Sequence, residues 1–326
     1  MALVTRRRNA GQISGESIVI EAAWMYYHDG LNQTEIAGQL GVSRATVVNY
    51  LQEAKTRGFI RISLSSSAFT THRLAQDLRE KFNLTAAYVV PEGNGSDEDT
   101  LLRVARGAGE WLPSLLEPGD RLGVAWGRTI FEVAEALEHG QTGNVAGDIT
   151  VTQLVGSMAT PYGFTAEICS AHMAQRLGAK CINLHAPAVL SDPDLAARLR
   201  AEPIIRDQIE ALSRCNKAIF AAGSCDHTSH VVSSGVASHA DLDWYKAQGA
   251  TGVLCGRFID AKGRSIPGDL DARIIGVELD RLLNLDMGML VSNGADKVAP
   301  MLAAIAGGFV THVVTSSGTA ADMLQG

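Results

Sequence analysis

Two short segments carry residues suited to binding an anion or a group of hydroxyls. In WGRT, residues 126–129, a glycine, a hydroxyl and backbone N–H groups follow an apolar run and precede a helical pattern. NGADK, residues 293–297, repeats this arrangement after GMLVS and adds Lys297. Helix N-termini favour anions because their first N–H groups are unpaired and the helix dipole is positive there. The two segments therefore predict a ligand site.

Other strand ends carry small polar residues of the same kind. Gly-Ser pairs follow two further apolar runs, at 156–157 and 223–224, and the helix opening TAEI begins at Thr165. Ligands of an open parallel sheet bind where the carboxyl ends of its strands meet. The predicted ligand contacts are Gly127, Arg128, Thr129, Gly156, Ser157, Thr165, Glu167, Gly223, Ser224, Asn293, Gly294 and Lys297. The alternative for the Gly-Ser pairs is a purely structural role, since strand-to-helix turns favour glycine.

Signatures of catalysis or metal binding do not accompany these loops. No G-x-S-x-G, Walker A or G-x-G-x-x-G follows a strand. The run CDHTSH, 225–230, lacks the second ligand pair of a metal site and is expected to be a polar loop near the pocket. Loops 126–129 and 153–165 contain no lysine for a Schiff base. We expect no catalytic residue, no metal and no cofactor.

The elements that must position these loops alternate along the chain after residue 72. Leu74, Leu78 and Phe82 recur every four residues and predict a helix, which the strand AAYVV, 86–90, follows. The alternation continues through LLRVARGAGEWL, RLGVAW, TIFEVAEAL and DITVTQLVG, and ends with MGMLVS, DKVAPMLAAIAGG and THVVT. Apolar strands separated by amphipathic helices indicate a parallel sheet covered on both faces. We expect a doubly wound α/β domain of about seven strands.

The first part of the chain follows a different pattern. Helices are predicted over 17–28, 33–40 and 44–57, and the alternating FIRISLS, 59–65, predicts a strand that would form the wing of a winged module. The small polar run SSSAFTT, 65–71, is expected to be a linker or hinge. This division predicts an all-α N-terminal domain over 1–66 and an α/β domain over 67–326.

The segment 33–52, QTEIAGQLGVSRATVVNYLQ, fits a helix-turn-helix. Such a motif needs apolar residues where the helices cross, a small residue at their closest approach and a tight turn. Ala37 is the small residue and Gly41 supplies the turn. Asn32 and Glu35 are spaced as a capping box. The apolar positions are Ile36, Leu40, Val42, Val47 and Tyr50.

Polar residues are expected on the outward face at the start of the third helix. Ser43 would cap that helix, leaving Arg44 to pair with guanine, Asn49 with adenine and the Thr46 methyl with thymine. Basic residues further on would contact phosphates. The predicted DNA contacts are Ser43, Arg44, Ala45, Thr46, Asn49, Lys55 and Arg57, and the Arg6–Arg8 run is expected to be a mobile tail. A helical pair serving only protein contacts is the alternative.

Composition and charge are compatible with this division. The chain carries a net charge of −7, but residues 1–66 hold seven basic and five acidic side chains, a net +2. Phosphates would therefore repel the acidic body and not the head. Hydrophobic residues at 46% and charged residues at 19% indicate an ordered protein. Five cysteines without a CxxC pair, and the lack of a secretion signal or spanning segment, predict a cytoplasmic protein that does not contact membranes.

The segment LNQTEIAGQLGVSRATVVNYLQEAKTRGFIRI resembles the N-terminal domain of the SorC family of sugar-responsive transcription regulators. The resemblance continues through LGVAWGRT (122–129), QLVGS (153–157), GATGVLCGRFIDAKGR (249–264) and 294–297. It implies an effector domain related to the sugar-phosphate isomerase and deaminase fold, and homodimers or homotetramers on paired operator half-sites of double-stranded DNA. It also implies a sugar phosphate or polyol effector, with contacts at Gly127, Arg128, Thr129, Gly294 and Lys297.

The chain departs from the family pattern at three places. It has Ser292–Asn293–Gly294 where Ala-Gly-Gly is frequent, Ser316–Ser317 in place of an Asp-Glu pair, and Val253 where many members carry an acid. Fewer charges around the pocket favour an uncharged polyol over a sugar phosphate.

A regulator of a carbohydrate catabolic operon, switched by its effector, is the function that these features predict together. An alternative is a sugar-phosphate isomerase or deaminase with a DNA-binding head, for which Glu167, Asp226 and His227 would be the acid–base candidates. A second alternative is a constitutive architectural protein with a vestigial pocket.

Overall fold

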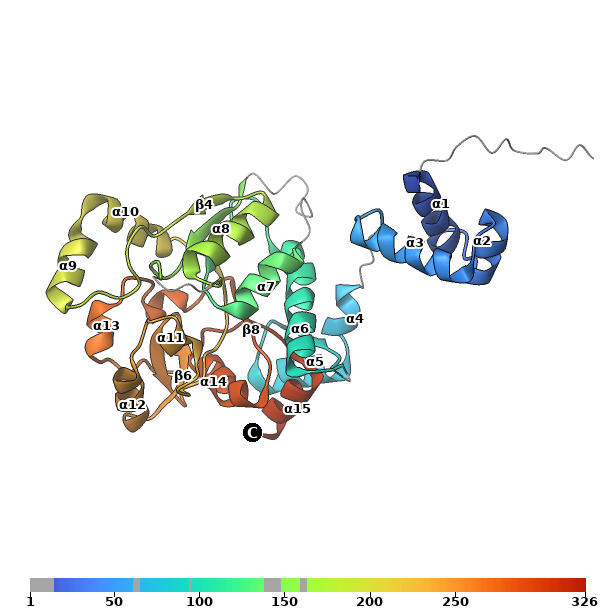
Figure 1. The fold of residues 1–326 in the computed structure, drawn as a ribbon. Coiled ribbons are helices and arrows are strands. Elements are labelled where there is room, and N and C mark those ends of the chain that lie inside the picture. Colours follow the sequence, from blue (N-terminus) through green and yellow to red (C-terminus); the bar gives the residue numbers. More distant parts are fainter. Residues whose placement is uncertain (1–14, 61–64, 94, 138–147, 159–162) are drawn as a thin grey trace, which may run out of the picture. The chain divides into compact units, whose positions relative to one another are not determined.

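The computed structural model describes residues 15–60, 65–93, 95–137, 148–158 and 163–326 (Figure 1). Its contacts divide the chain into two compact units, Met1–Leu64 and Ser65–Gly326, which are called the N-terminal and C-terminal units below.

The N-terminal unit contains the three predicted helices, α1 (Gly15–Tyr27), α2 (Gln33–Leu40) and α3 (Arg44–Thr56). The Asn32 side chain accepts hydrogen bonds from the backbone N–H groups of Thr34 and Glu35, and the Glu35 carboxylate accepts one from Asn32 N. This reciprocal pairing confirms the capping box. Gly41 ends α2 with φ +68°, a left-handed conformation that glycine adopts without strain. The helices enclose a small core of Val19, Ala22, Ala23, Ile36, Ala37, Val47, Leu51 and Ala54.

The junction between the units differs from its prediction. The strand expected over 59–65 falls mainly on 61–64, which lie outside the described residues. The prediction of a linker over 65–71 is wrong, because Ser66–Thr70 form the short helix α4 of the C-terminal unit. The ring of Phe69 stacks on Tyr88 with 5.0 Å between centroids. One aromatic residue among small polar ones thus anchors the segment to the core.

The C-terminal unit is built on the predicted parallel sheet. Its seven strands all run parallel, in the order β1-β9-β8-β5-β2-β3-β4. In this order β5, between β8 and β2, lies at the centre. The strands are β1 (Ala86–Val90), β2 (Arg121–Val124), β3 (Thr150–Gln153), β4 (Lys180–Ile182), β5 (Lys217–Phe220), β8 (Met287–Val291) and β9 (His312–Ser316).

Helices cover both faces of this sheet, as the continuous apolar strands predict (Figure 1). Successive residues of β5 point to opposite faces: Phe220 packs in one hydrophobic cluster and Ile219 in the other. The cluster around Phe220 includes residues of α5 (Arg73–Phe82), α14 (Ala295–Ala306) and α15 (Ser317–Gln325). The cluster around Ile219 includes residues of α6 (Asp97–Trp111), α7 (Arg128–Ala136) and α8 (Ala166–Leu177).

A further subregion lies between β4 and β8 in the chain. It contains α9 (Pro193–Ala201), α10 (Pro203–Leu212), α11 (His230–Ser233), α12 (His239–Ala247), α13 (Asp269–Arg273) and a 3₁₀ turn at Leu279–Leu282. Another 3₁₀ turn, Leu112–Leu115, follows α6. The segment 250–260 forms an antiparallel hairpin, β6 (Ala250–Leu254) and β7 (Arg257–Asp260), outside the main sheet. Among the described helices, none is long and apolar enough to span a bilayer.

Candidate functional site

The start of α3 presents the residues that the sequence predicts for base contacts. Ser43 caps the helix by accepting a hydrogen bond from Thr46 N at 3.1 Å, which confirms its predicted role as a cap. Arg44, Ala45 and Asn49 are exposed, whereas Thr46 is half-buried and its hydroxyl lies 2.8 Å from that of Ser43. The Thr46 methyl therefore remains the part of this side chain able to contact a base. An exposed polar face at the start of the second helix of the motif is what the prediction of a recognition helix requires.

The predicted phosphate contacts differ in their surroundings. Lys55 is exposed near the end of α3. The Arg57 guanidinium pairs with Glu53 at 3.0 Å and Glu16 at 2.8 Å, and lies 4.5 Å from the centroid of the Phe59 ring. Arg57 thus ties α1 to α3 and is less available to a phosphate than Lys55. The Arg6–Arg8 run lies outside the described residues.

A cavity of about 260 Å³ opens at the carboxyl ends of β2, β5 and β8. Its position is the one that the rule for open parallel sheets predicts. Seven of the predicted ligand contacts line it: Gly127, Arg128, Thr129, Gly223, Ser224, Asn293 and Lys297. Three strand-to-helix loops, far apart in the sequence, are thus brought to one cavity.

Two glycines give the cavity its open helix ends. Gly127 and Gly294 precede α7 and α14 with φ of +104° and +110°, conformations that side-chain-bearing residues rarely adopt. Neither helix has a side-chain cap in the structure. A Cβ at Gly127 would lie 3.4 Å from Nδ1 of His230, a residue of the cavity wall. Glycine therefore lets the backbone approach the cavity closely.

The cations of the cavity each contact a carboxylate. Arg128 forms an ion pair with Glu98 of α6. The Lys297 ammonium lies 2.7 Å from the Asp296 carboxylate and donates to the Ser224 hydroxyl at 3.2 Å. Burial lowers the pKa of His230, and the positive charges of Lys297 and Arg128 lower it further. Protonation of His230 is therefore disfavoured at this part of the cavity wall.

Five predicted contacts do not line this cavity. Gly156 N donates instead to Ile275 O at 2.9 Å and Ser157 N to Ala186 O at 2.7 Å, and a Cβ at Gly156 would lie 2.6 Å from two carbonyl oxygens. In the structure these two residues take part in loop packing away from this cavity, and their role as ligand contacts stays a prediction. Gly294 N donates to the Thr319 hydroxyl at 2.9 Å, although its neighbours line the cavity.

Thr165 and Glu167 are the other two, at the start of α8. Each has a buried side-chain oxygen without a hydrogen-bond partner among the described residues. The adjoining segment 159–162 is not described, so the surroundings of these two oxygens are only partly defined.

Sequence patterns missed several residues of the cavity wall. Leu101 lies in the second turn of α6, and Cys255 and Gly256 form the β6–β7 turn. Trp126 belongs to the WGRT segment, where its apolar ring gave no sign of a ligand role. His230 ends the polar run 225–230, which was expected near the pocket, and that part of the prediction is confirmed.

The remaining chemistry-bearing groups of that run lie elsewhere. His227 contacts His239, with 2.8 Å between their Nδ1 atoms, and Asp243 at 3.0 Å. The described residues contain no group of three or more His, Cys, Asp or Glu side chains able to hold a metal ion. Glu167, Asp226 and His227, the acid–base candidates of an isomerase or deaminase, do not line the cavity.

Comparison with known proteins agrees with this geometry. Residues 66–325 match the family described as "Putative sugar-binding domain". The chain is 37% identical over 324 residues to the "Uncharacterized transcriptional regulator YjhU" of Escherichia coli K12, with 98% of each chain covered. It is 29% identical to the "Deoxyribonucleoside regulator" of Bacillus subtilis 168, covering 95% of this chain and 98% of that one.

A solved structure shows the same fold. The full-length sorbitol operon regulator SorC from Klebsiella pneumoniae superposes with a TM-score of 0.78 at 21% identity, covering 96% of this chain and 99% of that one. The family match covers most of the chain, and the relatives named above match it over nearly their whole length: the chain belongs to the family described as "Putative sugar-binding domain" and is similar throughout to transcriptional regulators.

Proposed function

We propose that α3 binds operator DNA and that the cavity binds a phosphorylated sugar, whose occupancy sets operator affinity. The observation that carries the choice of ligand is the composition of the cavity wall. It contains Arg128 and Lys297 and, among the described residues, no carboxylate. A guanidinium and an ammonium at open helix ends favour a phosphate, which accepts charge-assisted hydrogen bonds from both.

The rest of the wall suits the carbon skeleton of a small sugar. Trp126, Leu101 and Val253 supply apolar surface, and Ser224, Asn293 and Thr129 supply hydroxyl or amide groups. Small-molecule sites combine a mainly apolar wall with a few convergent polar groups in this way. Burial is the main cause of the lowered pKa of His230, and the charges of Lys297 and Arg128 add to it, in line with a positive potential at this wall.

An uncharged polyol is the second candidate, and one observation favours it. Glu98 and Asp296 already pair with the two cations, so the empty cavity is closer to neutral than its wall suggests. Val253 in the wall, in place of an acid, agrees with a ligand of low charge.

The switch requires paired copies of the chain, as a homodimer or homotetramer. Two recognition helices engage one face of a duplex when they lie about 34–36 Å, or a multiple of this, apart. An effector that binds one arrangement of the copies better than another shifts the population between them by its differential affinity.

The test is a titration of labelled operator DNA with the full chain, followed by fluorescence anisotropy. Each titration is repeated with saturating sugar phosphates and with the matching unphosphorylated polyols. We expect a phosphorylated ligand to change operator affinity about tenfold or more, the usual range of allosteric coupling. A response to polyols alone would select the second candidate, and equal affinities throughout would exclude the switch.

A further inference from the structure

A carboxylate from outside the cavity wall holds one of its two cations. Glu98 belongs to the first turn of α6, and its carboxylate pairs with the Arg128 guanidinium at the start of α7. Glu132, on α7 itself, lies further from Arg128, at 3.9 Å. The pair with Glu98 therefore joins the N-terminal ends of two helices that follow different strands, β1 and β2, beside the cavity.

We propose that Glu98 is a displaceable counter-ion of Arg128: the anionic group of the effector takes its place and so releases the first turn of α6. The inference rests on the proposed function, because it assumes that an anion binds beside Arg128. It makes α6 the element that changes its contacts when the cavity fills, and it makes Glu98 a determinant of effector charge.

The surroundings of Glu98 permit such an exchange. The side chains of Arg128 and Glu98 are 35% and 43% exposed, so separating them leaves neither charge buried. The N-terminus of α6 is held by the Ser96–Asp99 capping box as well as by Glu98, so α6 stays helical when the pair with Arg128 is broken, although its first turn is held less firmly. Both groups can bind the guanidinium through two oxygens, but a phosphate monoester has a third acceptor oxygen and more negative charge than a carboxylate. The phosphate is therefore the stronger partner for Arg128.

Packed aromatic side chains connect α6 to α4, the first helix of the C-terminal unit. Leu101 of α6 lines the cavity, and Trp111 at the other end of the helix packs on Tyr88 with 5.4 Å between ring centroids. Tyr88 stacks on Phe69 of α4. Helix α4 begins at Ser66, two residues after the boundary of the N-terminal unit. Packed side chains of this kind are the physical means by which sites influence one another.

The experiment compares Glu98→Gln with Asp97→Asn in the full chain. Asp97 is exposed in the same helical turn, so its variant loses the same charge without breaking the pair with Arg128. Inorganic phosphate is the probe, and its affinity is measured by isothermal titration calorimetry. We expect Glu98→Gln to bind phosphate about threefold more tightly than the wild type, since an exposed ion pair is lost from the empty state, and Asp97→Asn to stay close to the wild type.

A second measurement separates displacement from a general effect of charge. Hydrogen exchange of the hydrogen-bonded backbone amides of Asp99 and Thr100 should rise when phosphate saturates the wild type, and should already be raised in Glu98→Gln without phosphate. Glu98→Ala should repeat both results. Equal phosphate affinities in the wild type and the Glu98 variants, unchanged exchange, or no phosphate binding in any variant would overturn the inference. An operator response to an uncharged polyol would survive those outcomes, so failure here is distinguishable from failure of the switch itself.

Discussion

The two units of the chain assemble their binding surfaces in opposite ways. The N-terminal unit presents one continuous segment, 33–56, in which each helix end and each exposed polar residue follows from its neighbours. The C-terminal unit collects its cavity from loops after β2, β5 and β8, with Leu101 and Lys297 almost two hundred positions apart. Local sequence therefore predicts the first surface in detail and the second only as a set of candidate loops.

Their charged residues differ as well. Arg44 is exposed on α3 and, within the described part of the chain, donates a 3.2 Å hydrogen bond to the neutral Gln33 amide and pairs with no carboxylate, so it is available to a polyanion. In the cavity, Arg128 and Lys297 are paired with carboxylates. The surface around Arg44 therefore suits a partner with many negative charges. In the cavity, a small anionic ligand would have to replace the carboxylates that pair with the two cations.

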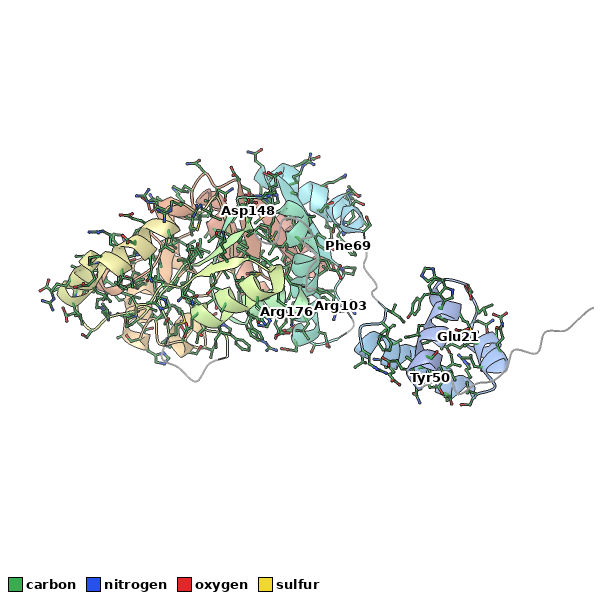
Figure 2. The ribbon with its side chains drawn as sticks, turned by 90° about the horizontal axis from the view of Figure 1, so that it is seen from above. Glu21, Tyr50, Phe69, Arg103, Asp148 and Arg176 are labelled. Atoms are coloured by element: carbon green, nitrogen blue, oxygen red, sulfur yellow. The ribbon has the colours of Figure 1, made fainter. Side chains whose placement is uncertain are left out.

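The first prediction tests whether DNA recognition depends on the segment 33–56. Figure 2 labels Tyr50 in this segment and Glu21 in α1 of the same unit. The double variant Arg44→Ala/Asn49→Ala should weaken operator binding by about 4 kcal/mol, about a thousandfold, because two base contacts of about 2 kcal/mol each are lost. Fluorescence anisotropy with operator and with scrambled DNA measures it. Gln39→Ala, exposed at the end of α2, is the control. A folded double variant with undiminished selectivity would contradict the assignment of α3.

The second effect concerns the C-terminal unit alone and depends on pH. Burial lowers the pKa of His312 from 6.5 to about 4, and the charge of Lys217 contributes to the shift. Between those values the unfolded chain binds a proton that the folded chain does not, so stability is full above pH 6.5 and falls as the pH drops toward 4. His312 should account for a loss of about 3 kcal/mol of unfolding free energy over this range.

Urea unfolding between pH 7 and 4 measures that slope. His312→Gln should flatten it, whereas His185→Gln, at an exposed position, should leave it in place. An unchanged slope in His312→Gln would show that other groups cause the acid sensitivity, and α3 should stay folded over the same range if the units respond separately.

The third prediction tests whether Lys297 affects binding of the effector without affecting binding of operator DNA. Lys297→Met should weaken binding of a phosphorylated effector by about 2 kcal/mol, about thirtyfold, by removing a charge-assisted hydrogen bond. Operator affinity without effector should change little. Calorimetry and anisotropy report the two quantities, and Lys262→Met, an exposed lysine of the same unit, is the control. Equal losses for phosphorylated and neutral ligands would argue against a phosphate at Lys297.

The smallest effect tests how strongly local capping determines the N-terminal unit. Asn32→Ala removes the side chain that accepts from Thr34 N and Glu35 N and should cost about 1 kcal/mol. Thermal unfolding of the full chain, followed by a probe in α1 such as Trp24 fluorescence, measures it. Gln39→Ala again serves as the matched exposed change, and a cost well below that of a typical cap would show that tertiary contacts hold α2 in place.

Local sequence patterns were sufficient to predict the helix-turn-helix, its caps and the parallel α/β sheet. These features depend on short-range periodicity: apolar residues at helical spacing, glycine at a left-handed turn, and buried strands between amphipathic helices. The same patterns also placed WGRT and NGADK at strand ends, since a strand followed by a glycine and a helix marks its own carboxyl edge.

Tertiary structure alone decided which strand ends share the cavity. The order β8-β5-β2 brings three loops together and leaves the β3 loop, with Gly156 and Ser157, packed against 186–188. It also decided that Phe69 fixes α4 to Tyr88 where a linker was expected, and that Glu98 meets Arg128. Such contacts join residues far apart in the chain, and neither spacing nor composition specifies them, because they depend on strand order and on which side chains the packed helices bring within reach.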